Sequence, residues 1–272
     1  MSQTPISSEQ LWALLRTEAH GVVAQEPVLA SYIHSVILHH QSLAEAVSFH
    51  LANLLDSTTA PALLLREVCL DAMHSDAMIM RNLCRDIVAY FERDAACDHY
   101  LMPVLYFKGF HALQAYRVAH WLWLQDRKML ALHFQNRMSE VFAVDIHPGA
   151  RIGGGIMIDH ATGVVIGETV VIDDDVSMLH EVTLGGSGNL RGSDRHPKIR
   201  RGVLLSAGAK ILGPVQIGEG AKVGAGSVVL NDVPAHCTAA GVPARIIGRP
   251  EADEPALGMD HQLRESGDAV DN

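Results

Sequence analysis

Two groups of residues in the second half of the chain have side chains suited to chemistry. His160 follows Asp145 by fifteen residues, and a later segment contains Arg191, Asp194, Arg195, His196 and Lys198. A histidine beside a carboxylate is suited to act as a general base, because the unperturbed pKa of imidazole is about 6.5. The same pair is equally compatible with a surface histidine at a bend and an aspartate that caps a turn. The spacing alone leaves both interpretations open.

The composition of the chain changes near residue 142, which indicates two different domains. Residues 1–142 contain all fourteen aromatic residues and only two glycines, whereas residues 143–250 contain nineteen glycines and no aromatic residue. One uniform fold would not divide its residues in this way. Residues 251–272 contain seven acids and no repeat, and we expect them to form a mobile tail.

Residues 1–142 are expected to form five to eight packed helices. Apolar residues recur there at three- and four-residue spacing, and Ser8 resembles a helix start. Further helices are expected to begin near three prolines, Pro27, Pro61 and Pro103. Six histidines between residues 20 and 74 form no cluster with metal-ligand spacing, so we interpret them as polar helix faces and core histidines.

Residues 143–250 carry an aliphatic residue at every sixth position. The thirteen positions are Ile146, Ile152, Ile158, Val164, Val170, Val176 and Val182, then Ile199, Leu205, Ile211, Ile217, Val223 and Val229. An α-helix has a period of about 3.6 and a strand a period of 2, so neither explains a period of six. A coiled ribbon with short flat sides does, since each side presents one residue inward. The pattern predicts a parallel β-helix of hexapeptide repeats.

A break of seventeen residues between Val182 and Ile199 interrupts the repeat. We therefore expect residues 184–198 to leave the coil as a loop. Long loops on rigid scaffolds often carry function, and this one contains the charged group described above.

Charge and cysteine content exclude several classes of protein. The formal net charge is −10, which argues against binding nucleic acid or an anionic membrane. No apolar run reaches the length of about 18 residues that a spanning helix needs, and the N-terminus lacks the pattern of a secretory signal. The four cysteines form no CxxC pair, which favours free thiols in a reducing compartment. We expect a cytoplasmic protein.

Several stretches resemble serine O-acetyltransferases. The specific ones are KGFHALQAYR in the first half, together with IDHATG and DRHPKI in the second. The resemblance covers residues 10–250. It implies an α+β architecture, with an N-terminal α-helical domain (1–142) followed by a left-handed parallel β-helix (143–250) and the loop 184–198. It also implies trimers through the β-helices and hexamers, as dimers of trimers, through the helices.

The resemblance implies a reaction and its ligands. Acetyl-CoA would donate an acetyl group to the hydroxyl of L-serine, giving O-acetylserine and CoA in the first step of cysteine biosynthesis. Cysteine would act as a feedback inhibitor, and no metal would be required. His160 matches the family's catalytic histidine, and Asp145 matches the carboxylate that orients it.

Further site residues follow from the same resemblance. Those matching the serine and cysteine site are Asp94, Asp159, Arg195 and His196, with Arg195 and His196 supplied by a neighbouring subunit. An arginine can hold a carboxylate through two parallel hydrogen bonds. Candidates for the CoA site are Gly185, Ala207, Ala225, Lys222 and Arg245, where small residues leave backbone groups open to the amide arm.

Three alternatives stay open at this point. A hexapeptide acetyltransferase acting on a sugar or another small hydroxyl substrate would use the same coil and base. A zinc hydratase would need closely spaced histidines, and a scaffold protein would have no activity. The chain ends in Asn272 rather than isoleucine, so an interaction with O-acetylserine sulfhydrylase is doubtful.

Overall fold

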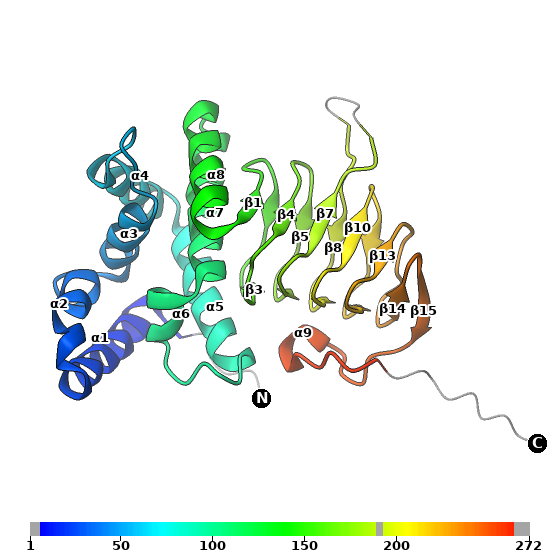
Figure 1. The fold of residues 1–272 in the computed structure, drawn as a ribbon, viewed down its shortest axis with the longest axis horizontal. Coiled ribbons are helices and arrows are strands. Elements are labelled where there is room, and N and C mark those ends of the chain that lie inside the picture. The colour runs from blue at the N-terminus through cyan, green and yellow to red at the C-terminus, as the bar shows by residue number, and fades with distance from the viewer. Residues whose placement is uncertain (1–5, 189–192, 264–272) are drawn as a thin grey trace, which may run out of the picture. The chain divides into compact units, whose positions relative to one another are not determined.

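The computed structural model describes residues 6–188 and 193–263 and divides into two compact units at Phe142 and Ala143. Ala269–Asn272, whose sequence made an interaction with the sulfhydrylase doubtful, lie outside the described residues, as does Arg191 of the loop. Figure 1 shows the first unit as helices and the second as a stack of short strands.

The first unit is helical, as expected, with eight α-helices in residues 6–142. They are α1 (Ser8–Gln25), α2 (Ala30–Ile33), α3 (Leu43–Leu54), α4 (Ala62–Ser75), α5 (Ala77–Arg93), α6 (Leu101–Tyr106), α7 (Lys108–Leu124) and α8 (Lys128–Phe142). A 3-10 helix, η1 (Pro27–Leu29), and a π-helix, η2 (His34–Leu38), flank α2.

Local sequence explains several helix starts. The Ser7 side chain accepts a hydrogen bond from the Gln10 N–H while the Gln10 side chain accepts one from the Ser7 N–H, which forms a capping box before α1. Pro61 is the residue before α4, and Pro27 opens η1. Proline is favoured at helix starts because the N–H that it lacks would have no acceptor within the helix there.

Helices α5 and α7 meet around a buried ion pair. Arg117 donates two hydrogen bonds to one carboxylate oxygen of Asp86, from Nε at 3.0 Å and Nη2 at 2.7 Å. Gln114 donates a third at 2.9 Å. The Asp86 side chain is fully buried. Each helix supplies one member of this buried ion pair, so each charge has its partner only when α5 packs against α7.

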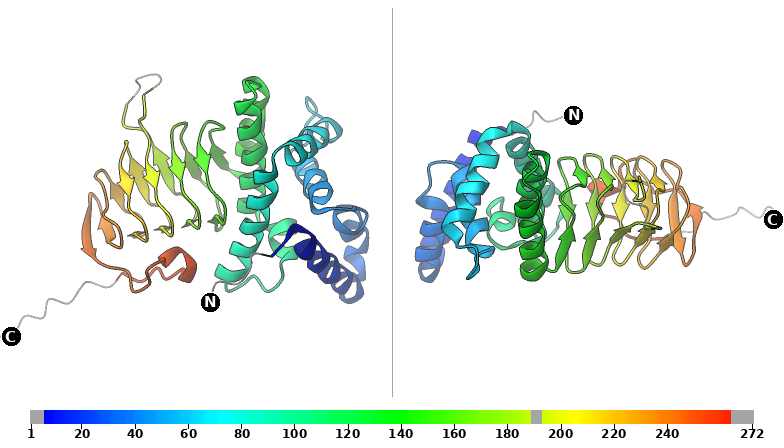
Figure 2. Two further views of the ribbon diagram at one scale, coloured as in Figure 1. Left: turned by 180° about the vertical axis from the view of Figure 1, so that it is seen from behind. Right: turned by 90° about the horizontal axis from the view of Figure 1, so that it is seen from above.

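The second unit is a parallel β-solenoid whose strands form three sheets. Sheet A contains β1 (Val144–Ile146), β4 (Val164–Ile166), β7 (Thr183–Gly185), β10 (Lys210–Leu212) and β13 (Val228–Val229). Sheet B contains β2 (Arg151–Ile152), β5 (Val171–Ile172), β8 (Lys198–Ile199) and β11 (Gln216–Ile217). Sheet C contains β3 (Met157–Ile158), β6 (Ser177–Met178), β9 (Leu204–Leu205), β12 (Lys222–Val223), β14 (Thr238–Gly241) and β15 (Ala244–Gly248). This confirms the expected fold and is consistent with a left-handed β-helix of hexapeptide repeats. Figure 2 shows the stacked coils from behind and from above.

The three sheets define three kinds of corner. Corner CA joins sheet C to sheet A and contains residues 159–163, 179–182, 206–209 and 224–227. Corner AB joins sheet A to sheet B and contains residues 147–150, 167–170, 186–188, 193–197 and 213–215. Corner BC joins sheet B to sheet C and contains residues 153–156, 173–176, 200–203 and 218–221.

The register of the strands corrects the expected series of thirteen positions. Ile146 pairs with Ile166, twenty residues later, and Ile166 then pairs with Leu184, eighteen residues later. The step from Ile158 to Ile166 therefore contains eight residues rather than six. The extra two residues lie in the segment 159–163 of corner CA.

Each coil has two inward series, as the buried Val144, Ala150 and Ile156 show for the first coil, and the sixfold series passes from one to the other between Ile158 and Val164. Ile166, Ile172, Met178 and Leu184 occupy the hydrogen-bonded positions, and Val164, Val170, Val176 and Val182 lie two residues before them; all eight are buried. A shift of two residues keeps a side chain on the same face of a strand, because the period of a strand is two. The four valines point inward, as expected, but they lie two residues before the positions that continue the series of Ile146, Ile152 and Ile158.

The residues after the last coil differ from the expected mobile tail. A short helix, α9 (Pro255–Gly258), packs against β6 and β9 of sheet C. The Ser177 hydroxyl donates to the carbonyl of Ala256 at 2.8 Å, and His261 Nδ1 lies 3.0 Å from the Ser206 hydroxyl. Apolar and hydrogen-bonded contacts hold residues 255–262, despite the acidic composition of the segment. We call residues 251–263 the C-terminal strap.

Candidate active site

The lengthened segment of corner CA positions His160. His160 and Ala161 have φ values of 57° and 58°, in the left-handed region that residues other than glycine seldom adopt. The N–H of Thr162 bonds to the carbonyl of His160 at 2.7 Å, and the N–H of Gly163 bonds to the carbonyl of Ala143 at 2.7 Å. The two extra residues therefore form a tight, hydrogen-bonded bulge that turns the imidazole out of the coil. Backbone strain of this kind is concentrated at functional sites.

The His160 side chain is accessible and lies beside polar neighbours. It is 71% exposed within one chain, and its Nε2 lies 3.4 Å from a carboxylate oxygen of Asp159. The ring of His180, from the next coil, packs edge-on against it with the centroids 5.8 Å apart. One accessible imidazole, one carboxylate and a second imidazole thus share this edge of the solenoid.

His180 is a member of this group that the sequence did not single out as a site residue. Its Nδ1 is buried and has no hydrogen-bond partner among the described residues. A buried nitrogen left without a partner costs about 1–3 kcal/mol. The sequence could have predicted this contact only if the coil were known to contain twenty residues, because His160 and His180 are then neighbours on successive levels.

Asp145 lies on β1 of sheet A, close to the same corner. It pairs in register with Val165, and the carbonyl of Ala143, two residues before it, accepts the hydrogen bond from Gly163. Both neighbours of Asp145 in β1 point into the core, so its side chain projects from the outer surface of sheet A. Asp145 therefore lies on the strand that borders the lengthened corner.

Small residues continue corner CA beyond the histidines. The Gly208 N–H bonds to the carbonyl of His180 at 3.0 Å, and the Gly226 N–H bonds to the carbonyl of Ala207 at 2.8 Å. Ala207 and Ala225 therefore occupy successive levels of one column that starts at His160. Gly185 lies elsewhere, at the end of β7 where sheet A meets corner AB.

Arg195 and His196 belong to corner AB and not to corner CA. The Arg195 guanidinium forms an ion pair with Glu168 at 2.8 Å, which lowers the pKa of that carboxyl. The His196 ring is 6% exposed and lies against Gly167, where a Cβ atom would come within 2.2 Å of it. Burial, with the nearby charge of Arg195, lowers the pKa of His196. Arg195 and His196 are therefore held in place by neighbouring residues, but they lie on a different edge of the solenoid from His160.

The candidate residues therefore fall on two edges of one solenoid. Sheet A separates corner CA, with Asp159, His160 and His180, from corner AB, with Arg195 and His196. Side chains on two corners of a packed prism cannot converge on one small molecule within a single chain. A site that uses both groups requires a second copy of the chain.

The two basic candidates for phosphate binding lie on sheet C. Lys222 is 2% exposed because the C-terminal strap covers it, and its Nζ donates to the carbonyl of Gln262 at 2.6 Å. Arg245 on β15 is exposed. Lys222 can reach a phosphate only after residues 260–262 of the strap move away.

Asp94 belongs to the helical unit. It is the residue that ends α5, and its carboxylate accepts a hydrogen bond from the N–H of Ala96 at 2.8 Å. This geometry gives Asp94 a structural role at a helix end, and its assignment to the serine site stays a prediction of the resemblance.

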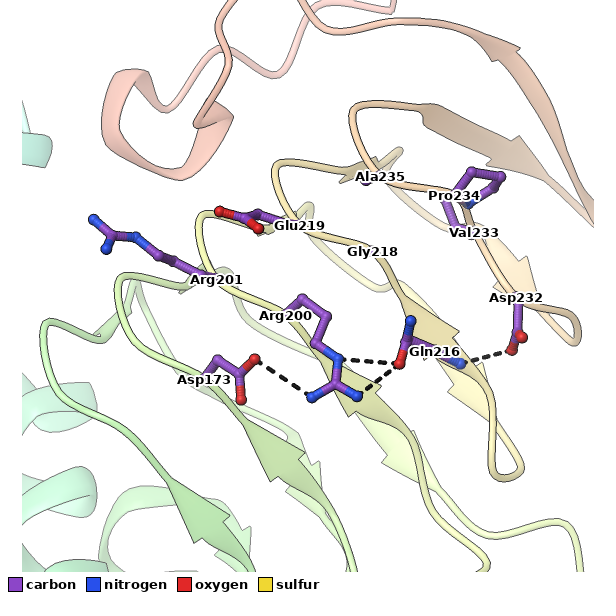
Figure 3. Close-up of a pocket in the computed structure, with 10 residues that line it drawn as sticks. All are labelled: Asp173, Arg200, Arg201, Gln216, Gly218, Glu219, Asp232, Val233, Pro234 and Ala235. Carbon is purple, nitrogen blue, oxygen red and sulfur yellow. Dashed lines mark hydrogen bonds and ion pairs between the residues drawn. The ribbon is translucent and has the colours of Figure 1, made fainter.

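A cavity of about 510 Å³ lies at corner BC, away from all of these residues. Figure 3 shows Arg200 between Asp173 and Gln216, with the Gln216 N–H bonded to Asp232 at 2.8 Å. Arg200 and Asp173 form an ion pair within this cavity, and none of the predicted site residues lines it.

No group of three or more histidines, cysteines and acids among the described residues could hold a metal ion. No helix in the described ranges is both long and apolar enough to span a bilayer.

This chain is similar to known proteins over most of its length. Residues 11–115 match the family model described as serine acetyltransferase, N-terminal, and residues 196–231 match the bacterial transferase hexapeptide (six repeats). A serine acetyltransferase from Escherichia coli (strain K12) is 54% identical over 94% of this chain and 93% of its own length.

Solved structures give the same result. A serine acetyltransferase from Vibrio cholerae O1 biovar El Tor N16961 is 56% identical, with a TM-score of 0.93 over 94% of this chain and 99% of its own. A serine acetyltransferase in complex with cysteine is 51% identical, with a TM-score of 0.92 over 95% of this chain and 100% of its own. Similar structures include complexes with CoA and with serine. The full length of the match, the helical unit included, shows that this chain belongs to the serine acetyltransferase family.

Proposed function

We propose that corner CA is where this chain carries out the reaction of its family, the transfer of the acetyl group of acetyl-CoA to the hydroxyl of L-serine. The products are O-acetylserine and CoA, and the reaction begins the biosynthesis of cysteine. The single observation that carries the location is the two-residue lengthening at 159–163, which exposes His160 beside Asp159 and His180.

His160 acts as the general base in this proposal. A serine hydroxyl is a weak nucleophile at neutral pH, and it attacks the thioester carbonyl once a base within hydrogen-bond reach takes its proton. The same imidazolium then protonates the departing CoA sulfur. Asp145 orients the ring and stabilises its charged form, as the acid of a catalytic triad does.

Arg195 and His196 of a neighbouring copy complete the serine site. The guanidinium of Arg195 binds the serine carboxylate through parallel hydrogen bonds, and Asp159 faces the ammonium group. Corner AB of one chain therefore lies against corner CA of the next, and closing such a head-to-tail contact generates a ring, here a trimer. Two trimers pair through their helical units. Cysteine, which shares the ammonium and carboxylate of serine, inhibits by occupying the same groups.

The arm of CoA lies along the column of small residues that follows His160. The small side chains of Ala207 and Ala225 leave the backbone N–H groups of this column open to the amides of the arm. Gly185 lies at the far end of β7 and would contact CoA from sheet A. Lys222 and Arg245 contact the phosphates after the strap releases Lys222.

The first experiment tests the base. Release of CoA from acetyl-CoA is measured with serine and, separately, with a panel of sugars. We expect serine alone to support turnover, and His160→Ala to reduce it by about 10²–10⁴-fold, the usual contribution of a general base. His74→Ala, which removes an exposed histidine at the end of α4, is the matched control. Near-normal turnover of His160→Ala with an intact fold would exclude this role.

The second experiment tests the shared site by mixing two inactive variants. His160→Ala and His196→Ala chains are unfolded together, refolded as mixed oligomers and assayed. If each site takes His160 from one chain and His196 from another, about a quarter of the sites regain both histidines, by random assortment. Sites confined to one chain would give no recovery, and that result would overturn the arrangement.

A further inference from the structure

Thr169 lies in corner AB and has no part in the proposed function. Two of its groups contact the same nitrogen of His196, Nδ1. The backbone N–H of Thr169 donates a hydrogen bond to His196 Nδ1 at 3.2 Å, and the Thr169 hydroxyl lies 2.8 Å from the same nitrogen. The hydroxyl oxygen also accepts a hydrogen bond from the N–H of Arg195 at 3.2 Å. One threonine thus contacts both residues that the proposed site takes from this corner.

These contacts fix the position of the proton on the imidazole. A backbone N–H is a donor and never an acceptor, so His196 Nδ1 must present a lone pair to Thr169 and carry no proton. The neutral ring then holds its proton on Nε2. The hydroxyl of Thr169 accepts from Arg195 and can donate its own proton to Nδ1, which favours the same tautomer.

A second acceptor competes for that hydroxyl proton without changing the result. Lys198 lowers the pKa of the Asp194 carboxyl, and a hydrogen bond from the Thr169 side chain adds to the effect. If the hydroxyl turned towards Asp194, the backbone N–H of Thr169 would still occupy Nδ1. The tautomer therefore depends on the backbone first and on the hydroxyl second.

The other nitrogen of the ring is left available. Nε2 has no hydrogen-bond partner among the described residues, and two glycines, Gly167 and Gly186, leave room beside it. A Cβ atom on Gly167 would lie 2.2 Å from Nε2, and one on Gly186 would lie 3.2 Å from it. A side chain at the first position would close the approach to this N–H.

The charged groups around the ring also favour its neutral form. Arg195 and Lys198 disfavour an imidazolium, while Glu168 acts in the opposite direction and His147 adds a further titratable group. Lys198 is itself held by the carbonyls of Thr169, at 2.7 Å, and of His196, at 3.0 Å. The base of the loop is therefore fixed to residue 169 at three points: the imidazole of His196, the N–H of Arg195 and the ammonium of Lys198.

We propose that Thr169 is a positioning residue that holds His196 as the neutral Nε2–H tautomer, so that His196 offers serine a hydrogen-bond donor rather than a base or a cation. The substrate part of this inference rests on the proposed function, whereas the tautomer does not. In this arrangement His160 alone removes the proton of serine, and His196 orients the substrate.

Nitrogen NMR tests the tautomer directly. Protein labelled with 15N-histidine is studied in the solid state, and the resonances of His196 are assigned by their loss in His196→Gln. We expect Nδ1 of His196 to be unprotonated and Nε2 protonated at neutral pH. In Thr169→Val, which keeps the N–H but lacks the hydroxyl, the Nδ1 resonance shifts. A protonated Nδ1 in the unsubstituted protein, or an unchanged resonance in Thr169→Val, overturns the proposal.

Kinetics test the consequence for the substrate. We expect Thr169→Val to lower kcat/KM for serine about fivefold to tenfold, the loss that corresponds to one hydrogen bond, and to leave the KM for acetyl-CoA unchanged. Thr169→Ser, which restores the hydroxyl, recovers most of kcat/KM. Thr17→Val, which removes an exposed hydroxyl from α1, changes neither value.

The two readouts separate this inference from the proposed function. Equal loss for serine and acetyl-CoA, or no recovery in Thr169→Ser, would assign Thr169 a purely structural role and overturn the inference. If His196→Gln left serine kinetics unchanged while NMR showed the expected tautomer, the shared serine site would be wrong and the role of Thr169 towards the ring would stand.

Discussion

The two units of this protein bury their polar side chains in different ways. In the helical unit, charged and titratable groups lie inside the core: Asp86, Arg117 and His111 are each no more than 5% exposed. In the solenoid the stacked core positions are aliphatic. Among the described residues of the solenoid, two basic residues are buried, and both depend on segments that leave the coil. His196 belongs to the loop at corner AB, and the C-terminal strap covers Lys222.

This difference shows where each unit can accommodate charged side chains without losing stability. Helices can pair charges from two elements, and such pairs help to specify which faces pack together. The inward positions of a coil are surrounded by the aliphatic side chains of neighbouring levels, so a charged group there would lack a partner. The solenoid therefore keeps its chemistry at corners and in added segments, where a substitution affects function more than folding.

The largest expected effect comes from breaking the buried pair of the helical unit. Asp86→Ala leaves the guanidinium of Arg117 buried without its partner, and we expect a loss of about 3–5 kcal/mol in the free energy of unfolding. Urea denaturation followed by tryptophan fluorescence measures it, because all three tryptophans lie in residues 1–142. The double variant Asp86→Leu with Arg117→Met removes both charges and is the control, with most of the stability retained. A loss below about 1 kcal/mol for Asp86→Ala would contradict the contrast between the units.

An intermediate effect is expected from acid on His111. Burial, with a contribution from His50, lowers the pKa of His111 to about 3, and its Nε2 lies 2.8 Å from the carbonyl of Val104. Below pH 6.5 the unfolded chain binds a proton that the folded chain does not, so stability falls as the pH falls from about 6.5 towards 3. The loss from this one group is about 1.4 kcal/mol per pH unit.

Comparison with His111→Gln isolates that contribution. Unfolding free energies are measured by tryptophan fluorescence at pH 7 and pH 5.5 for both proteins, so that the other histidines cancel. We expect the variant to depend less steeply on pH than the unsubstituted protein. Equal slopes would mean that His111 does not remain neutral in the folded helical unit.

The smallest effect is expected at an exposed ion pair of the solenoid. Arg201 at corner BC is 54% exposed and lies 2.8 Å from Glu254 and 3.2 Å from Asp175. Because solvent screens such pairs, we expect Arg201→Ala to cost less than about 1 kcal/mol and the cost to shrink in high salt. Thermal unfolding at low and high salt measures it. A loss as large as that of Asp86→Ala would remove the distinction between the units.

The sequence predicted the fold because its two periods are unambiguous. Helical spacing before residue 142 and the period of six after it each allow one architecture. The lengthened segment at 159–163 was missed because Val164 and Ile166 are both aliphatic and both point inward. Two series offset by two residues look alike in the sequence, and strand pairing alone distinguishes them.

The candidate site was predicted less completely than the fold. The resemblance identified His160, Asp159, Arg195 and His196, but nothing in their spacing reveals that they occupy two different corners. Thr169 and Glu168 could not be identified from sequence, because their contacts run to residues 26 and 27 positions away across the loop. The Asp86 and Arg117 pair likewise joins residues 31 apart on two helices.

If corner CA carries the reaction, as proposed, the lengthening at 159–163 also limits how many reaction centres a chain can have. A coil that repeated without variation would present the same edge at every level of the prism. Two additional residues make one level unlike the rest. Whole coils inserted beyond Val229 would therefore extend the track for the acyl donor, and add cohesion between neighbouring levels, without duplicating the machinery.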